Sequence, residues 1–247
     1  MTARSEYRGR MKDLVADLRA KADQRNPEAA ACFSDGLSVT NMGDQSVLRI
    51  YEEISQYGIT AGDVIDALDQ VTGSSLRVEL NSPGGSVFDG ITIHNALRSH
   101  PAHITVRVDG IAASIASVIV QAGDVRIMQP GAQMMVHNAF GVAIGNKSDH
   151  ADMAALLELQ DGVIAGIYAS RSGRDAGEFR ALMDAETWLT DQAAVDAGLA
   201  DAVAKFEPKL VAKATTVVEA VVPEPTAEPT SAPPFSLIAA NANRRRR

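Results

Sequence analysis

The chain has 247 residues, 46% of them hydrophobic, and a formal net charge of −8. This length suits one sizeable domain with appendages, and the single cysteine, Cys32, excludes an internal disulfide. Residues 44–206 hold 10 Lys/Arg against 21 Asp/Glu, a balance that argues against nucleic-acid binding by this region. The longest apolar stretch, Ile111 to Val120, is too short to span a bilayer, and the N-terminus has no signal-peptide core, so we expect a cytoplasmic protein.

Composition divides the chain into three regions. Residues 1–43 are predicted to be a charged N-terminal helical extension, with a helix over 4–25 that carries a narrow apolar stripe. Residues 44–206 are predicted to be the folded domain. Residues 207–247 are predicted to be a Pro-rich disordered linker and a basic tail that ends in four arginines. That tail is either simply solvated or docks on an acidic partner or a nucleic acid.

The middle region alternates between strand and helix patterns. Strands are predicted over 46–54, 75–82, 103–110, 125–131 and 133–140, with a last one after the final helix. Helices are predicted over 60–71, 87–100, 114–121, 149–171, 175–183 and 190–198. This alternation predicts an α/β fold with a mostly parallel sheet and crossover helices.

Ser114 lies where a β-branched strand, broken at Gly110, turns into an apolar helix. Serine is a common N-cap, because its oxygen accepts a bond from an exposed helix N–H. A serine at a helix start is also suited to nucleophilic catalysis, with a backbone N–H beside it for an oxyanion. Taken alone, this stretch favours the N-cap.

Further candidates for acyl-transfer chemistry follow other predicted strands. His137 ends an apolar strand, where a histidine is more often a core or edge residue than a base. The stretch "NSPGGSVFDG" (81–90) is either an ordinary turn or a glycine loop that lets backbone approach a substrate closely. Asp184 and Glu186 in "MDAETWL" are the candidate acids. Nucleophile, base, acid and oxyanion donors are the parts that acyl transfer needs.

The stretches "NSPGGSVFDG", "DGIAASIASVI", "MMVHNAF" and "ETWLTDQAAVDAGLAD" together resemble the ClpP family of serine peptidases. They look closest to its phage and prophage members, the head-maturation or prohead proteases. The resemblance covers about residues 44–206, with the motifs in the family's order and register. It implies a ClpP/crotonase-like fold and a ring-forming homo-oligomer that needs no cofactor.

The resemblance also implies a role for each matching position. Ser114 would be the nucleophile and His137 the base. The family's third residue, an aspartate, falls on Glu186, with Asp184 as the fallback. The backbone N–H groups of Gly85 and Ile115 would form the oxyanion hole. The positions that would bind extended substrate are Gly84, Phe140, Gly141 and Val142.

Several other functions compete with this interpretation. The Ser–His pair argues against a crotonase-like acyl-CoA enzyme, because those enzymes do not need it. It also argues against a relative of the signal-peptide peptidases, because those use a Ser–Lys pair and a membrane anchor. The stretch "GVAIGNKSD" misses the phosphate-loop motif because Asn146 intervenes. No spacing of His, Cys or carboxylates suggests a metal. Two alternatives stay open: a degradative Clp-type subunit that works with an unfoldase ATPase, and a non-catalytic assembly protein. The expected partners are protein substrates, among them scaffold and capsid proteins.

Overall fold

The computed structural model describes residues 36–205 of the chain. The predicted helix over 4–25, Cys32, the Pro-rich linker and the arginine tail lie outside these residues. Within them, strands and helices alternate as the sequence predicts, and the α/β class is confirmed. The predicted domain boundary at residue 44 stays a prediction, although the first strand already begins at Leu37.

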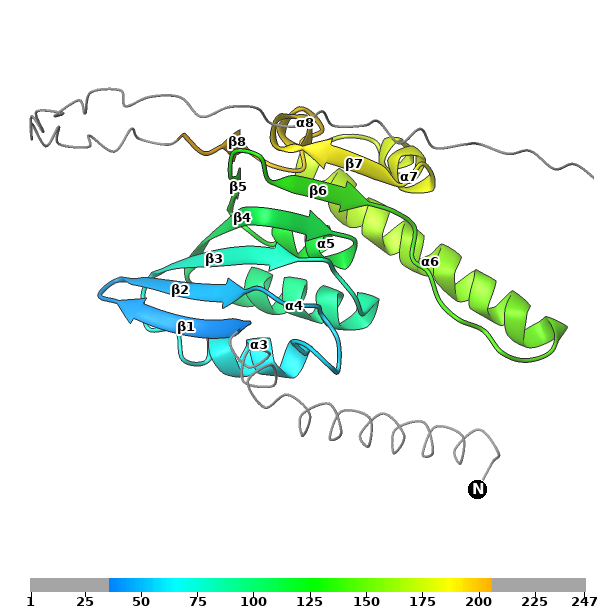
Figure 1. Ribbon diagram of the computed structural model, residues 1–247, viewed down its shortest axis with the longest axis horizontal. Helices are drawn as coiled ribbons and strands as arrows, with labels where there is room; N and C mark the ends of the chain where they lie inside the picture. The colour runs from blue at the N-terminus through cyan, green and yellow to red at the C-terminus, as the bar shows by residue number, and fades with distance from the viewer. Residues whose placement is uncertain (1–35, 206–247) are drawn as a thin grey trace, which may run out of the picture. The chain divides into compact units, whose positions relative to one another are not determined.

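One sheet of eight strands organises the domain (Figure 1). Its main path runs β1-β2-β3-β4-β5-β8, and β6 pairs with both β4 and β7. Only the β1–β2 and β6–β7 pairings are antiparallel in the described sheet. The strands are β1 (Leu37–Met42), β2 (Gln45–Ile50), β3 (Ser75–Ser82), β4 (His103–Ala113), β5 (Val125–Met128), β6 (Gln133–Val136), β7 (Thr187–Thr190) and β8 (Ala202–Val203).

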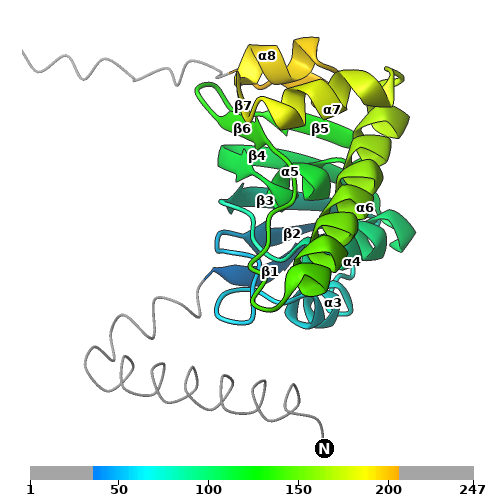
Figure 2. The ribbon, with the colours of Figure 1, turned by 90° about the vertical axis from the view of Figure 1, so that its right-hand side faces the viewer.

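Helices α3 to α6 cover one face of this sheet (Figure 2). Polar side chains start most of them: Thr60 and Asn146 form capping boxes on α3 and α6, and Ser86 caps α4. The helix α6 is the longest described and ends at Gly173, which has a φ of 71°. The helices are α3 (Ala61–Leu68), α4 (Val87–Ser99), α5 (Ile115–Val120), α6 (Lys147–Ser172), α7 (Ala176–Asp184) and α8 (Asp191–Asp196).

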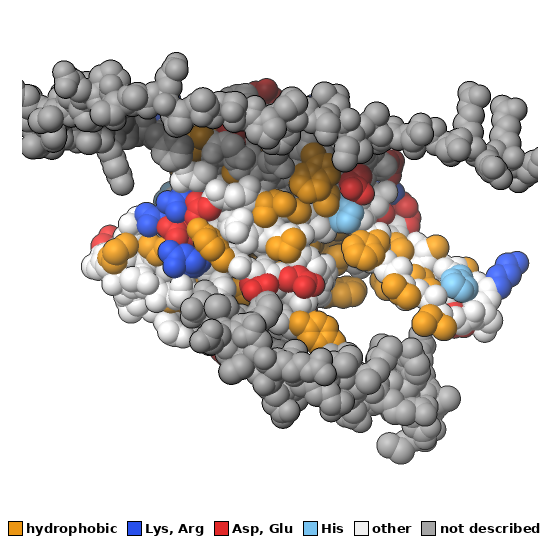
Figure 3. Space-filling model, viewed as in Figure 1, with side chains coloured by type: hydrophobic (Ala, Val, Ile, Leu, Met, Phe, Trp, Pro, Cys, Tyr) orange, Lys and Arg blue, Asp and Glu red, His pale blue; other side chains and the backbone are white. Residues whose placement is uncertain are grey.

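The opposite face of the sheet carries charged side chains in a cross-strand row. Arg49, Glu79 and Arg107 are register partners on β2, β3 and β4, and Glu79 bonds both arginines, at 3.0 and 2.9 Å. Figure 3 shows basic and acidic side chains gathered over this part of the sheet. Glu79 is 5% exposed, and these two arginines together with Arg77, which bonds it at 3.2 Å, supply the pairing that a buried carboxylate needs.

The structure corrects one expectation about the central strand and decides between two alternatives for the helix that follows it. β4 does not stop at Gly110 but continues to Ala113, because Asn81 accepts a hydrogen bond from the Ile111 N–H at 3.1 Å where the ladder shifts register. A Cβ on Gly110 would lie 2.7 Å from that Asn81 oxygen, so the glycine makes room for it. From the sequence alone, the apolar stretch Ile111 to Val120 is either a contact between subunits or ordinary core. Every residue of α5 is buried inside the domain, which supports ordinary core.

Candidate active site

The turn from β4 into α5 holds Ser114 in an unusual backbone conformation. Its φ is 54° and its ψ is −129°, and among described non-glycine residues only Ser114 and Glu186 have a positive φ. Such a conformation costs on the order of 1–3 kcal/mol and is typical of functional positions. Ser114 occupies the N-cap position of α5 as the sequence suggests, but its side chain makes no capping hydrogen bond to the helix.

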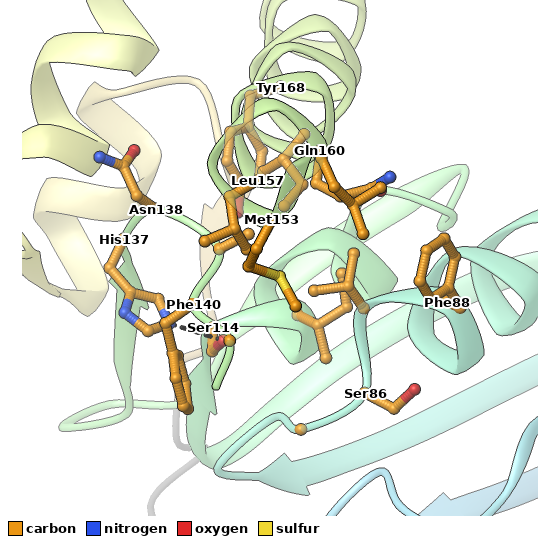
Figure 4. A pocket seen from close by; sticks show the side chains of 17 residues that line it. Ser86, Phe88, Ser114, His137, Asn138, Phe140, Met153, Leu157, Gln160 and Tyr168 are labelled. Carbon is orange, nitrogen blue, oxygen red and sulfur yellow. Dashed lines mark hydrogen bonds between the residues drawn. The ribbon is translucent and has the colours of Figure 1, made fainter. Parts of the chain in front are cut away.

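Strand pairing brings His137 to this serine. β6 runs parallel to β4 with Ala113 opposite Met135, and the Ser114 N–H donates to the Met135 carbonyl at 2.9 Å. His137 follows β6 directly, so both side chains leave neighbouring strand ends in the same direction. The distance from His137 Nε2 to Ser114 Oγ is 2.8 Å (Figure 4). This is the contact that a base needs to take the proton of a serine nucleophile.

Two glycines bring the loop after β3 against this turn. Gly84 has a φ of +94°, and a Cβ there would lie 2.5 Å from the Ala113 carbonyl oxygen and 2.7 Å from Ser114 Cβ. Gly85 has a φ of +142°, and a Cβ there would lie 2.1 Å from the Ile54 carbonyl oxygen. Only glycine fits either position without displacing backbone.

The same loop turns the Gly85 N–H away from Ile54, the residue with which the loop pairs. Gly84 and Ser86 both bond to Ile54, through the Gly84 carbonyl at 2.8 Å and the Ser86 N–H at 2.6 Å. The Gly84 C=O and the Gly85 N–H belong to one trans peptide and point in opposite directions, so the Gly85 N–H points away from the Ile54 N–H that the Gly84 carbonyl accepts. Ile115 is the first residue of α5, and its N–H has no carbonyl within the helix to bond. Gly85, Ser114 and Ile115 line one cavity, as oxyanion donors beside a nucleophile would.

The two candidate acids lie close to each other but in different surroundings. Asp184 Oδ1 accepts a hydrogen bond from Asn138 Nδ2 at 2.8 Å, and Asn138 is the neighbour of His137. Glu186 is exposed and has a φ of 46°. Within residues 36–205, the hydrogen bonds found for His137 reach Ser114 and no carboxylate. The structure therefore brings Ser114 and His137 together but joins neither acid to the imidazole.

The cavity beside Ser114 has a volume of about 280 Å³ and is mainly apolar. Figure 4 shows Met153 and Leu157 of α6 facing it, with Phe88 of α4 at the far side. The polar residues Gln160 and Tyr168 also line it. An apolar cavity of this kind suits a hydrophobic side chain of a bound chain next to the reacting bond.

The predicted substrate segment follows His137 without forming a strand. Phe140, Gly141 and Val142 have no regular secondary structure, and Phe140 is 79% exposed. The Phe140 ring lies 5.9 Å from the His137 ring, centroid to centroid, and Phe140 and Gly141 line the cavity. Its exposed backbone suits pairing with an extended peptide, so its role in substrate binding stays a prediction.

Two contacts around the site were not predicted from the sequence. The buried Asp161 of α6 accepts a hydrogen bond from the Ala139 N–H at 2.6 Å and so holds the segment after His137. The buried Ser117 bonds to the Ser114 carbonyl at 2.5 Å and to the Tyr168 hydroxyl at 2.7 Å. In the sequence, Asp161 is one of several charged residues on a predicted helix, and no local pattern indicates that it is buried.

The described residues contain neither a metal site nor a membrane-spanning helix. Between residues 36 and 205, no group of three or more His, Cys, Asp or Glu side chains is arranged to hold a metal ion. In the same range, no helix combines the length and the hydropathy that crossing a membrane requires.

Comparison with known proteins gives one consistent match. The family model described as Clp protease matches residues 42–207. A protein of Ligilactobacillus salivarius named ATP-dependent Clp protease proteolytic subunit is 32% identical over 148 residues, which are 59% of this chain and 74% of the relative. A protein with the same name from Bacteroides fragilis is 31% identical, over 56% of this chain and 67% of its own length. Another from Pleurastrum terricola is 33% identical, over 51% of this chain and 66% of its own length. Since the family model spans most of the chain and includes both Ser114 and His137, this chain belongs to the Clp protease family and is a serine-type peptidase.

Proposed function

We propose that this protein is an endopeptidase that cleaves protein chains through Ser114, His137 and Glu186. The observation that carries the proposal is the 2.8 Å contact between Ser114 Oγ and His137 Nε2 beside a cavity. Ser114 Oγ attacks the peptide carbonyl carbon while His137 Nε2 takes its proton, which gives a tetrahedral oxyanion. The N–H groups of Gly85 and Ile115 bind that oxyanion.

The second half of the reaction uses the same groups. Protonated His137 gives its proton to the leaving amine, and the C–N bond breaks to leave an ester on Ser114. Water then attacks this ester, His137 takes the water's proton, and the acid product leaves as Ser114 regains its hydrogen. Glu186 is proposed to orient the imidazole and to stabilise its positive charge. The left-handed backbone at Glu186, a conformation rare outside glycine, supports a functional position there.

The first experiment is labelling of the full chain with a fluorophosphonate, with wild type beside Ser114→Ala. We expect one adduct by intact mass on wild type and none on the variant. The Ser114 side chain makes no helix-capping hydrogen bond, so the alanine variant does not destabilise α5 by the loss of a cap. The absence of an adduct on folded wild type would refute an activated Ser114 in this chain.

A second pair of variants identifies the acid. Glu186→Gln is expected to slow labelling by up to about 10⁴-fold, the size of the effect when a triad acid is lost. Asp184→Asn is expected to slow it much less, because the family resemblance places the acid at Glu186 and the Asp184 carboxylate already accepts a hydrogen bond from Asn138. The opposite order of the two rates would assign the acid to Asp184.

For the biological setting, we propose a head-maturation protease that cleaves scaffold or capsid proteins inside a phage prohead in the host cytoplasm. The charged segment before the domain and the arginine-rich end after it support this setting, since both suit docking in an assembly. We also propose a ring of identical subunits and a crotonase-like core, both from the resemblance. A mass in solution equal to that of one 26.1 kDa chain would refute the ring.

A degradative role is the second candidate, favoured by the name ATP-dependent Clp protease proteolytic subunit that the relatives carry. In that case the protein would need an unfoldase ATPase to digest folded substrates. Digestion of an unfolded protein and of a folded one, each with and without such an ATPase, separates the two roles. Stimulation by ATP would support degradation, and selective cleavage of a capsid or scaffold segment without ATP would support maturation. A non-catalytic assembly protein would show neither.

A further inference from the structure

A second hollow is lined by residues from the C-terminal halves of α4 and α6. Its volume is about 340 Å³. His94 and Arg98 of α4 line it together with Gly166, Ser170 and Arg171 of α6. A Cβ added to Gly166 would meet no atom within 4 Å, so the space beside this glycine is open.

Two buried nitrogen atoms at this hollow have no hydrogen-bond partner among the described residues. His94 is 9% exposed, and its Nδ1 lies 3.2 Å from Asn95 Oδ1 while its Nε2 is unpartnered. Arg171 donates from Nη2 to the Gly123 carbonyl at 2.5 Å, but its Nε is unpartnered. Burial without a partner is unfavourable for polar atoms, so a ligand that accepts from the Arg171 Nε–H and donates to His94 Nε2 would stabilise this place.

The charge of the hollow contrasts with that of the domain around it. Residues 44–206 carry twice as many acidic as basic side chains, yet two arginines and a histidine meet here. Burial, followed by repulsion from Arg126 and Arg98, holds the pKa of Arg171 below its ordinary value. Asp201 pairs with Arg126, and Asp124 lies 3.3 Å from Arg98, but the cations still repel one another. An anion between them would relieve this repulsion.

We propose that this α4–α6 basic pocket, formed by His94, Arg98, Ser170 and Arg171, binds the phosphate group of inorganic phosphate or of a phosphate monoester. Guanidinium groups match the oxygens of phosphate in pairs, and the serine hydroxyl adds a further donor. His94 Nδ1 donates to Asn95 Oδ1, so Nε2 of the neutral imidazole can accept the P–OH of a protonated phosphate. A singly charged carboxylate offers fewer acceptors and less charge. The pocket shares no lining residue with the Ser114 cavity, so the proposal does not depend on catalysis.

The test is calorimetric titration of the full chain with inorganic phosphate, and then with AMP, at constant ionic strength. We expect saturable binding that His94→Gln and Arg98→Gln each weaken about tenfold or more, the effect of one lost charge-assisted hydrogen bond. Arg174→Gln is the matched control, because Arg174 follows closely on the same chain segment but pairs with Glu178 away from the pocket. Binding of phosphate alone would assign the free ion, and binding of AMP as well would assign the monoester.

Two results would overturn the proposal. One is a phosphate titration of wild type without saturable heat. The other is an affinity that stays the same in wild type, His94→Gln and Arg98→Gln. The Arg98 side chain is 42% exposed, so its substitution leaves the core intact, and the test holds even where the buried His94 variant unfolds.

Discussion

Removal of the Asp161 carboxylate tests whether α6 holds the histidine segment in place. Asp161 is 5% exposed and its Oδ1 accepts the Ala139 N–H at 2.6 Å, two residues after His137. A hydrogen bond to a charged group contributes about 1.5–3 kcal/mol, so Asp161→Ala should lower the free energy of unfolding by about 2 kcal/mol. The freed segment would let the imidazole shift, and a misplacement of about 1 Å can cost about 10²-fold in rate.

The assay is the rate of fluorophosphonate labelling at Ser114, measured beside urea unfolding at equal protein concentration. Asp161→Asn is the matched control, because its carboxamide oxygen can still accept the Ala139 N–H. We expect the asparagine variant to keep most of the labelling rate that the alanine variant loses. Arg180 lies 3.8 Å from Asp161 but also bonds Glu158 at 2.8 Å, so it keeps a partner in both variants. Equal labelling and equal urea midpoints for Asp161→Ala and wild type would refute the reasoning.

Three further changes have defined outcomes. Gly84→Ala should lower the free energy of unfolding by well over about 1 kcal/mol and remove most of the labelling rate, because the added Cβ would clash with Ser114. A variant with the wild-type labelling rate would contradict this. Tyr168→Phe removes the 2.7 Å bond to Ser117 and should lower the urea stability by about 1 kcal/mol while labelling stays near wild type. Burial lowers the pKa of His94 in the folded protein. As the pH falls below about 6.5, the unfolded chain therefore binds a proton at His94 before the folded protein does. The free energy of unfolding then decreases until the pH has passed the pKa of the folded state. Urea midpoints across this range should fall in wild type and fall less in His94→Gln, and identical slopes would exclude His94 as the cause.

Periodicity was enough to predict most of the helices and central strands. The helix predicted over 60–71 is α3, started by Thr60, and the helix predicted over 149–171 is α6 within two residues at its start and one at its end. The four-residue β7 and the edge strand β1 were missed, because such short strands show little alternation. They are defined by pairing with β6 and β2, which a local pattern does not encode.

The site was predictable only where a family resemblance supplied the long-range contact. Twenty-three residues separate Ser114 from His137, and only the register of β6 on β4 makes them neighbours. The glycine loop was recognisable because Gly84 and Gly85 need backbone conformations that few other residues adopt. The role of Asp161 depends on which face of α6 turns inward, and charges along that helix do not reveal it. The part played by Glu186 stays a prediction, since its side chain is exposed and makes no contact with the imidazole within the described residues.

The parallel ladder between β4 and β6 also determines how the catalytic pair can come apart. Ser114 and His137 are carried by strand ends that a continuous run of backbone bonds joins, from Ile111 opposite Gln133 to the Ser114 N–H on Met135. Side-chain rotation can break the 2.8 Å contact briefly, but separation of the two backbones requires the sheet itself to open. The amide hydrogens of this ladder should therefore exchange with solvent about as slowly as those of the β3–β4 core. Separation of the two backbones would then accompany global unfolding and not a local fluctuation of the cavity.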